Sequence, residues 1–284
     1  MTPLLDVLWR VGRAVLIALG LAFLFLPLLA VFTAVAPVQA LRDLGSPVAI
    51  AALLLSLRTT AWSLTGIVAF GTPLALWLSR GGFPGKRIVE TAIGLPIVVP
   101  PAVAGVGLLL VLGRRGLLGP LLASAHVSIV FTATAVALAQ AFVAGPLYVI
   151  AARQAFDAVD PDLIAAARTL GASPMRAFWR IELPLASSGI AAGAALAAAR
   201  ALGEFGATML FAGNLPGITQ TLPLAIYTAL DSGLDTAVAM SELLLFAAFL
   251  LLLLITIAGR RRFAAADRAG ARDSARLPVS QTAR

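Results

Sequence analysis

The sequence predicts an all-α protein that crosses a membrane several times, and three observations support this fold class. Hydrophobic residues make up 60% of the 284 residues and charged residues only 12%, whereas soluble domains average about 45–50% and about 25%. The mean hydropathy is +0.98. The apolar residues are gathered into runs long enough to cross a bilayer as helices, for which roughly 20 apolar residues are needed.

Six apolar runs reach this length, and we expect each of them to be a transmembrane helix. They extend over Ala14–Ala36, Thr59–Ser79, Ile88–Leu112, Val127–Ala152, Leu185–Ala212 and Val238–Gly259. A further run, Val48–Leu57, is too short to span and is followed by Arg58, so it should either lie at the membrane interface or extend the second helix. The first run is too long for the apolar part of a typical signal peptide, which predicts a retained helix.

The distribution of Lys and Arg predicts which connections face the cytoplasm, because positive residues are retained on that side. If the N-terminus is inside, the inner segments carry most of these residues, namely Arg10, Arg13, Arg80, Lys86, Arg87, Arg153, Arg168, Arg176, Arg180, Arg260, Arg261 and Arg262. The outer segments carry only Arg42, Arg58, Arg114 and Arg115. We therefore predict a multi-pass membrane protein with both termini in the cytoplasm.

The chain is predicted to form one transmembrane domain, residues 1–262, followed by a short tail. Residues 263–284 are rich in Ala, Arg, Asp and Ser and hold almost no large apolar side chains. A segment of this composition cannot bury a core. We expect it to be a disordered cytoplasmic tail.

The composition excludes most catalytic chemistry. The chain has no cysteine and one histidine, His126, which rules out a thiolate nucleophile, a disulfide and a histidine metal cluster. The segment RGGFPGK, Arg80–Lys86, begins with Arg where a phosphate-binding loop needs Gly, and Arg87 follows where that loop needs Ser or Thr. We expect no nucleotide hydrolysis, no metal and no cofactor in this chain. The net charge of +8 is spread in short clusters, which is typical of topology signals and not of a nucleic-acid surface.

Prolines interrupt the third apolar run, in the segment GLPIVVPPAVAGVG. Pro96, Pro100 and Pro101 lack backbone donors, and the carbonyls that proline leaves free inside a membrane must find other partners. Two interpretations stay open. The helix is either broken, facing a protein interior or a watery pathway, or it is only kinked by packing.

The fifth run carries a charged pair, Arg200 and Glu204, whose i,i+4 spacing places both side chains on one helix face. Ionisable residues within a membrane span are costly and are functional candidates by default. The pair either fixes the orientation of the helix or lines a transport path, with Glu204 expected near outer water. Gly189 and Gly193 form a GxxxG motif in the same run, which we interpret as ordinary helix packing and not as a subunit interface.

The longest polar interruption in the second half of the chain is Asp162–Pro184, DLIAAARTLGASPMRAFWRIELP. Asp160 and Pro161 are suited to begin a helix, and Gly171 is suited to end it near Leu170. A second helical segment, MRAFWRIEL, should lead into the fifth span, with the last proline of the stretch at the join.

An inner helix-turn-helix of this kind is suited to insertion into the cleft of a partner. Phe156, Phe178 and Trp179 are the candidate anchors. The alternative is an amphipathic connector that lies on the membrane surface.

The spacing within this stretch resembles that of a known family. Ala166 and Ala167 are followed after three residues by Gly171, and after nine more by Ile181-Glu182-Leu183-Pro184. The pattern is similar to EAA-x3-G-x9-I-x-L-P, the EAA loop of permease subunits of ABC importers. Ala165 stands where the family usually has Glu, so that the shape of the loop is better supported than its charge.

The resemblance implies a type I importer fold with six spans, in which a coupling loop of about residues 157–184 sits on a cytoplasmic ATPase. The residues implied to couple to the ATPase are Ala165, Ala166, Ala167, Arg168, Gly171, Ala172, Phe178, Ile181, Leu183 and Pro184.

A narrower resemblance covers most of the chain after Ser56. The segments SLRTT, FPGK, LPIVVPPAVAGVGLLLVLGRRGLLG and RALGEFGATMLFAGNLPGITQTLPLAIYTAL are similar to permeases of molybdate importers. Sulfate importer permeases share much of this pattern, while Thr219–Leu230 and the GRRG turn favour molybdate. The resemblance implies ATP-driven import of molybdate by alternating access, with sulfate, thiosulfate or tungstate as alternative cargo. The candidate residues for the path or its gate are Arg200, Glu204, Thr208, Asn214 and Thr219.

The resemblance also implies the partners of the chain. They are a second copy of itself, two ATPase subunits that use ATP and Mg, and a periplasmic or extracellular molybdate-binding protein that docks near Gly213–Asp235. The resemblance further implies a non-catalytic subunit in the lipid bilayer of a bacterial plasma (inner) membrane, with no nucleic acid bound. An ion-coupled carrier that uses Arg200 and Glu204 is the alternative from another class, and an intramembrane enzyme is a more distant one.

Overall fold

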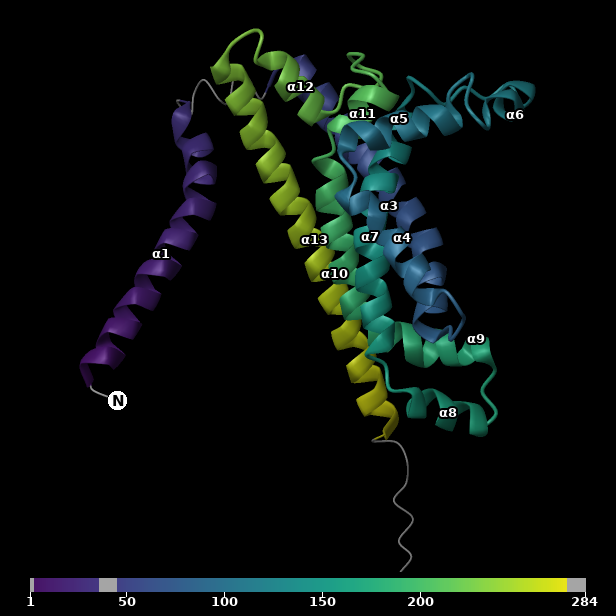
Figure 1. Ribbon diagram of the computed structural model, residues 1–284. Coiled ribbons are helices and arrows are strands. Elements are labelled where there is room, and N and C mark those ends of the chain that lie inside the picture. The colour runs from purple at the N-terminus through teal and green to yellow at the C-terminus, as the bar shows by residue number, and fades with distance from the viewer. Residues whose placement is uncertain (1–2, 36–44, 275–284) are drawn as a thin grey trace, which may run out of the picture.

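The computed structural model describes the backbone of residues 3–35 and 45–274, and the side chains of residues 9–35 and 45–257. All regular secondary structure in these ranges is helical, which confirms the predicted all-α class. Figure 1 shows long helices that form a bundle, with short helices lying across both ends of it.

The long helices are α1 (Pro3–Ala34), α3 (Pro47–Arg80), α7 (Ala133–Asp157), α10 (Leu183–Leu202) and α13 (Leu234–Ser274). The shorter helices are α4 (Lys86–Val98), α5 (Pro101–Leu112), α6 (Gly119–Ser124), α8 (Pro161–Thr169), α9 (Pro174–Ala177), α11 (Gly206–Phe211) and α12 (Leu222–Ala229), and a π-helix, η1 (Phe178–Glu182), joins α9 to α10. Within the described residues, five helices are long and apolar enough to span a membrane, and the bent pair α4 and α5 makes a sixth if it is counted as one span.

The centre of the bundle is formed by α3, α7 and α10, with α4 packed on α7 and α13 packed on α10. Ala144, Tyr148, Ala152 and Phe156 are buried at every fourth position of α7, as expected for one face of a helix. The spanning part of α1 is not buried by the other described residues. It lies apart from the bundle in Figure 1 and approaches α13 at one end.

Small residues set the distance between α7 and α10. A Cβ added to Gly189 would lie 2.5 Å from the Cβ of Ala155, and one added to Gly193 would lie 2.8 Å from the Cβ of Ala151. Glycine and alanine permit this close approach of two helix backbones. The GxxxG motif therefore packs α10 on α7 within this chain, in agreement with the sequence interpretation.

The third predicted span, Ile88–Leu112, is not one continuous helix. It is divided into α4 and α5, which meet at an angle of 112°. Pro100 and Pro101 explain the break, because proline lacks a backbone N–H and disfavours helical geometry in the residue before it. Of the two interpretations of this segment, the broken helix is confirmed.

The fifth predicted span, Leu185–Ala212, is also wrong at its outer end. Helix α10 stops at Leu202, and the short helix α11 follows after a turn at Gly203. The side chain of Glu204 accepts a hydrogen bond from the backbone N of Ala207 at 2.9 Å, so it caps α11 instead of continuing α10.

Two other boundaries move for local reasons. The predicted fourth span began at Val127, whereas α7 begins after Thr132, whose hydroxyl accepts from the backbone N of Ala135 at 3.3 Å. The run Val48–Leu57 extends the second span, because α3 begins after the N-cap Ser46. That confirms one of the two alternatives for this run.

The last long helix, α13, continues past the predicted end of the sixth span and reaches Ser274. Residues 263–274 of the predicted disordered tail are therefore helical, while residues 275–284 lie outside the described residues and the prediction of disorder there is untested.

Substitution of Gly193 by Val is expected to lower the free energy of unfolding by about 1–3 kcal/mol, because two methyl groups must enter the contact with Ala151. The measurement is the Tm of the purified protein in detergent. Gly66→Val is the control, since an added Cβ at Gly66 meets nothing within 4 Å. Equal Tm values for the two variants would contradict the close contact.

Candidate functional site

The predicted coupling loop lies across one end of the bundle, at the end where α1 begins (Figure 1). Its first helix, α8, is capped by Asp160, whose side chain accepts from the backbone N of Asp162 at 2.9 Å. Helix α8 ends beside Gly171, which has a φ of +87° and therefore a left-handed conformation that favours glycine. The predicted helix and its glycine stop are both confirmed.

The second half of the loop is a continuous helical path with no break at the predicted join, Pro184. Ser173 caps α9 by accepting from the backbone N of Arg176 at 3.3 Å, and α9 continues through η1 into α10. At the end of η1 the N–H of Leu183 bonds to the C=O of Phe178, five residues earlier. In an α-helix, Pro184 would clash with the C=O of Arg180, and the wider π turn relieves that clash.

The loop exposes part of the predicted coupling set, and the rest is half-buried. Ala165, Ala166, Arg168 and Gly171 are exposed. Phe178 packs inward, with its ring centroid 6.4 Å from that of Phe156. The half-buried members of the set are Ala167, Ala172, Ile181, Leu183 and Pro184.

Two of the three predicted aromatic anchors therefore face the bundle. Phe156 is 1% exposed, whereas Trp179 is exposed. Leu170, beside the glycine stop, is 89% exposed, and sequence reasoning did not select it. Leu163, Met175 and Trp179 of the same loop are exposed as well, and several exposed apolar side chains, unlike a single one, indicate an interaction surface. The place of Leu170 directly before Gly171 was the available signal.

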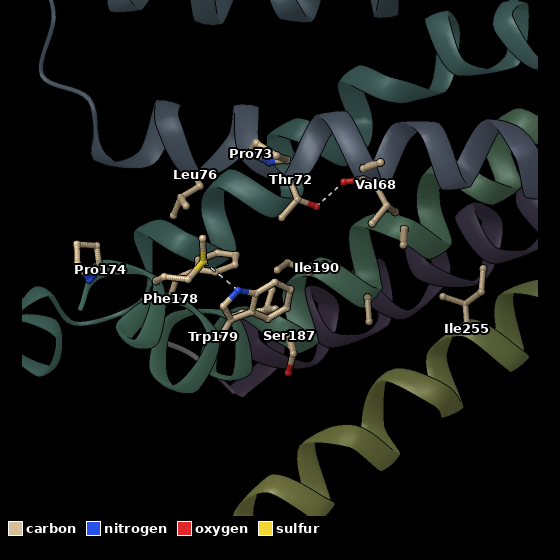
Figure 2. A pocket seen from close by; sticks show the side chains of 15 residues that line it. Val68, Thr72, Pro73, Leu76, Pro174, Phe178, Trp179, Ser187, Ile190 and Ile255 are labelled. Atoms are coloured by element: carbon tan, nitrogen blue, oxygen red, sulfur yellow. Dashed lines mark hydrogen bonds between the residues drawn. The ribbon is translucent and has the colours of Figure 1, made fainter. Parts of the chain in front are cut away.

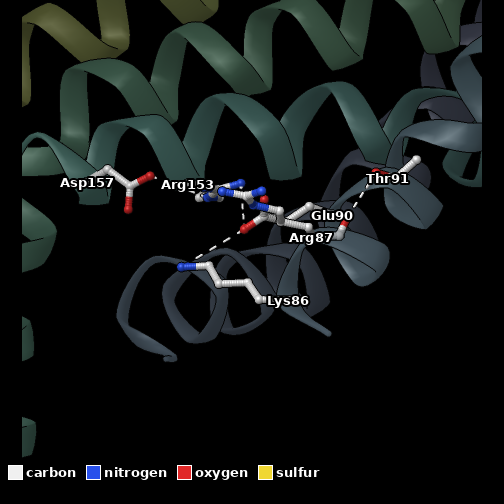
Figure 3. A network of polar contacts seen from close by, with 6 residues as sticks. All are labelled: Lys86, Arg87, Glu90, Thr91, Arg153 and Asp157. Carbon is white, nitrogen blue, oxygen red and sulfur yellow. Dashed lines mark hydrogen bonds and ion pairs between the residues drawn. The ribbon is translucent and has the colours of Figure 1, made fainter. Parts of the chain in front are cut away.

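A group of ion pairs lies at the ends of α4 and α7 that are nearest to the coupling loop (Figure 3). Glu90 is 3.0 Å from a guanidinium nitrogen of Arg153 and 3.9 Å from Nζ of Lys86, and Arg153 is 3.3 Å from Asp157. The pairs join α4 to α7 at the end of the bundle that carries the coupling loop. Sequence spacing could have suggested the i,i+4 pairs but not the contact between α4 and α7.

A groove of about 890 Å³ opens beside the coupling loop (Figure 2). Its walls are mostly apolar and come from α3, α9, η1, α10 and α13. Trp179 Nε1 donates to Met175 Sδ at 3.1 Å on one wall. Where the groove lies, the side chains of α3 and η1 do not pack against each other.

The charged pair of the fifth span is formed at the opposite end of the bundle from the coupling loop. Arg200 Nη1 lies 2.7 Å from Glu204 Oε2, with side-chain exposures of 35% and 1%. Glu204 is thus buried at the start of α11 and does not extend into outer water as expected. Its two oxygens bind the guanidinium and the backbone N of Ala207, so the pair holds the turn between α10 and α11.

The other candidate path residues are placed in the outer segment. Thr219 Oγ1 accepts from the backbone N of Leu215 at 3.0 Å and lies 3.2 Å from the C=O of Gly213. Asn214 donates to the hydroxyl of Thr228 at 2.9 Å, and Thr208 is fully buried on α11. These hydrogen bonds stabilise the outer loop, and they give Asn214 and Thr219 a structural role.

Sequence reasoning missed a buried polar stripe on α3. Ser56, Thr59, Thr60 and Ser63 are each at most 2% exposed and follow helical spacing along one face. Gln140 of α7 lies 3.5 Å from the hydroxyl of Thr60. The i, i+3, i+4, i+7 spacing of hydroxyl residues inside an apolar run was the available signal.

Comparisons with known proteins agree with this arrangement. Residues 67–262 match the family described as "Binding-protein-dependent transport system inner membrane component". The chain is 43% identical over 234 residues to the Molybdenum transport system permease protein ModB of Mycobacterium tuberculosis, covering 82% of this chain and 89% of that protein. It is 43% identical over 182 residues to the ModB protein of Escherichia coli, covering 64% of this chain and 80% of that protein.

A solved structure shares the fold. It is a chain of a bacterial alginate ABC transporter in complex with an alginate pentasaccharide-bound periplasmic protein. The TM-score is 0.71 at 18% sequence identity, over 91% of this chain and 96% of that chain. A likeness at this identity concerns the fold alone.

Substitution of Arg200 by Ala should lower the free energy of unfolding by about 3 kcal/mol, because it leaves the buried carboxylate of Glu204 without its cation. Thermal unfolding in detergent measures the loss. The double variant Arg200→Ala/Glu204→Gln removes the lone charge and should recover most of the stability. A double variant as unstable as the single one would show that the charge of Glu204 is not the cause.

Proposed function

The chain belongs to the family of binding-protein-dependent transport system inner membrane components, and we propose that it is the transmembrane permease subunit of an ATP-driven importer of molybdate. The observation that carries this proposal is the 43% identity to a molybdenum transport permease over 82% of the chain. The coupling loop supports it, since α8, Gly171 and the exposed Leu170 provide a shaped surface at one end of the bundle.

The driving force is proposed to enter at this loop. Two cytoplasmic ATPase subunits would each seat on one copy of α8, hydrolyse ATP with Mg, and move the loop as they close. The sequence supports this division, because RGGFPGK does not form a phosphate-binding loop. Because Ala165 lacks the carboxylate common in such loops, the seat on the ATPase depends on shape and apolar contact.

We further propose that two copies of the chain form the path between them and alternate between inward-facing and outward-facing states. A binding protein outside the membrane would select molybdate and dock on the outer segments, including Gly213–Asp235. The basic-residue count and the position of the coupling loop both support cytoplasmic termini. A tetrahedral dianion needs hydrogen-bond donors on its way but no tight site in the permease.

The cargo is tested by competition. The complete importer is reconstituted in proteoliposomes with its ATPase and binding protein. It should take up radiolabelled molybdate only when ATP is present on the side of the membrane that the ATPase faces. Unlabelled tungstate is expected to compete, and sulfate is expected to compete weakly. Stronger competition by sulfate or thiosulfate would reassign the cargo within the same family.

A stand-alone carrier is the second candidate, and the observation that favours it is the charged pair Arg200–Glu204 in the outer half of the bundle. Uptake of molybdate by the purified chain without any ATPase, driven by an ion gradient alone, would establish this candidate. Strict dependence on the ATPase would eliminate it.

Substitution of Gly171 by Val should uncouple the importer, because a β-branched residue is strained at a φ of +87° and would distort the turn after α8. We expect molybdate uptake to fall while the permease still inserts into the membrane. The measurements are uptake and co-purification of the ATPase. Gly82→Val is the control, since an added Cβ there meets nothing within 4 Å and no positive φ is required. Normal uptake by the Gly171 variant would contradict the coupling role.

A further inference from the structure

An ion pair joins the inner end of α3 to the π-helix of the coupling segment. Arg80 Nη2 lies 3.0 Å from Glu182 Oε2, and the two side chains are 37% and 8% exposed. A carboxylate with this degree of burial is costly without a cation beside it. The pair therefore fixes η1 against the end of α3 as long as Glu182 stays buried.

The position of Glu182 follows from the local sequence. Pro184 cannot donate to the C=O of Arg180, and the chain forms a π turn there, closed by the bond from Leu183 N–H to Phe178 C=O. A π turn holds more residues than an α turn, so the side chains that follow it point in other directions than they would in a continuous α-helix. The proline of the coupling loop thus accounts for the turn from which Glu182 reaches Arg80.

Other contacts between η1 and α3 are incomplete. The groove of about 890 Å³ lies between Thr72, Pro73 and Leu76 of α3 and Phe178 and Leu183 of the coupling side (Figure 2). The groove separates only part of the two segments, since Ala75 and Leu78 of α3 share a buried cluster with Ala177 of the coupling side. The ion pair at the end of α3 is a direct and geometrically defined connection between the two segments.

Helix α3 is suited to carry a displacement onward. It has 34 residues, which gives a length of about 50 Å at 1.5 Å per residue. The hydroxyl of Thr72 lies 2.5 Å from that of Tyr148 on α7. At the outer end, Ser56 Oγ accepts from the backbone N of Leu222, the first residue of α12, at 2.7 Å.

We propose that Glu182 and Arg80 are positioning residues that transmit the movement of the coupling loop to α3, and through α3 to the outer segment. The proposal rests on the proposed function, since it requires an ATPase that moves α8 and α9. Neither residue belongs to the fixed positions of the loop pattern: Glu182 occupies the open position between Ile181 and Leu183, and Arg80 lies about a hundred residues earlier in the chain.

The experiment uses the complete importer in proteoliposomes and measures molybdate uptake per ATP hydrolysed. Glu182→Gln removes the charge and keeps the size, and we expect the ratio to fall by at least about fivefold, the lower range of typical coupling between sites. Arg80→Lys keeps a cation and should retain most of the ratio. Glu90→Gln is the matched control, since it breaks a carboxylate–arginine pair with Arg153, also at 3.0 Å, that does not involve η1.

A double variant separates transmission from simple charge balance. Arg80→Met/Glu182→Met removes both charges, so no unpaired buried charge remains to impair assembly. If the pair transmits movement, this variant assembles with its ATPase and stays uncoupled. If the pair only balances charge, the double variant couples like the wild type, and the proposal is overturned even where Glu182→Gln fails to assemble.

The wild-type complex distinguishes failure of this inference from failure of the proposed function. Absence of ATP-dependent molybdate uptake in the wild type would contradict the proposed function. Coupled uptake in the wild type, together with wild-type ratios of uptake to ATP hydrolysis in both Glu182→Gln and the double variant, would overturn the role of the ion pair alone.

Discussion

The structure depends on one constraint: inside a membrane, each backbone N–H and C=O must find a partner within the protein. Long helices meet this demand along α3, α7 and α10, and their close approach needs the small residues at Gly189 and Gly193. Each departure from α-helix comes with its own compensation. Glu204 caps the turn between α10 and α11, and the π turn before Pro184 accommodates the missing donor. The breaks are therefore places where specific side chains are required, and these places coincide with the candidate functional segments.

The two ends of the bundle use polar groups differently. The inner end carries full charges, in the Arg80–Glu182 pair and in the network around Glu90 and Arg153. The buried face of α3 in the outer half instead carries hydroxyls, with Gln140 as a neutral partner. Ion pairs with defined geometry hold segments in register, whereas hydroxyls that bond to their own helix demand less from a neighbour. Thr59, for example, donates to the C=O of Leu55 at 2.9 Å. The end next to the coupling loop thus has ion pairs between different helices, Arg80–Glu182 and Glu90–Arg153, whereas the Arg200–Glu204 pair at the opposite end joins positions only four residues apart.

Much of this fold could be predicted from the sequence, because hydropathy and proline chemistry act locally. The count of spans, the helix α8 and its stop at Gly171 follow from composition and capping residues. The angle between α4 and α5, the early end of α10 and the inward position of Phe156 could not be predicted, since each is decided by packing between distant segments. The same holds for Arg80 and Glu182, which are about a hundred residues apart and show no spacing that links them. Local signals located the coupling segment, while its connection to the bundle needed three-dimensional contacts.

The scarcity of charge in this chain bears on how an anion can pass. Arg200 lies in the last turn of α10, and its charge is already matched by Glu204 at 2.7 Å. An arginine that is already paired with a carboxylate has little net charge to offer, so the pair cannot bind a dianion tightly. Transport requires such weak binding, because the anion must also leave the path. In the proposed importer, selection therefore comes from the binding protein, and the permease contributes a change of shape. If selection and ATP hydrolysis are done by partner proteins, this chain has to convert movement of the coupling loop into movement of its spans. In our proposal the Arg80–Glu182 ion pair between the coupling loop and α3 makes that connection.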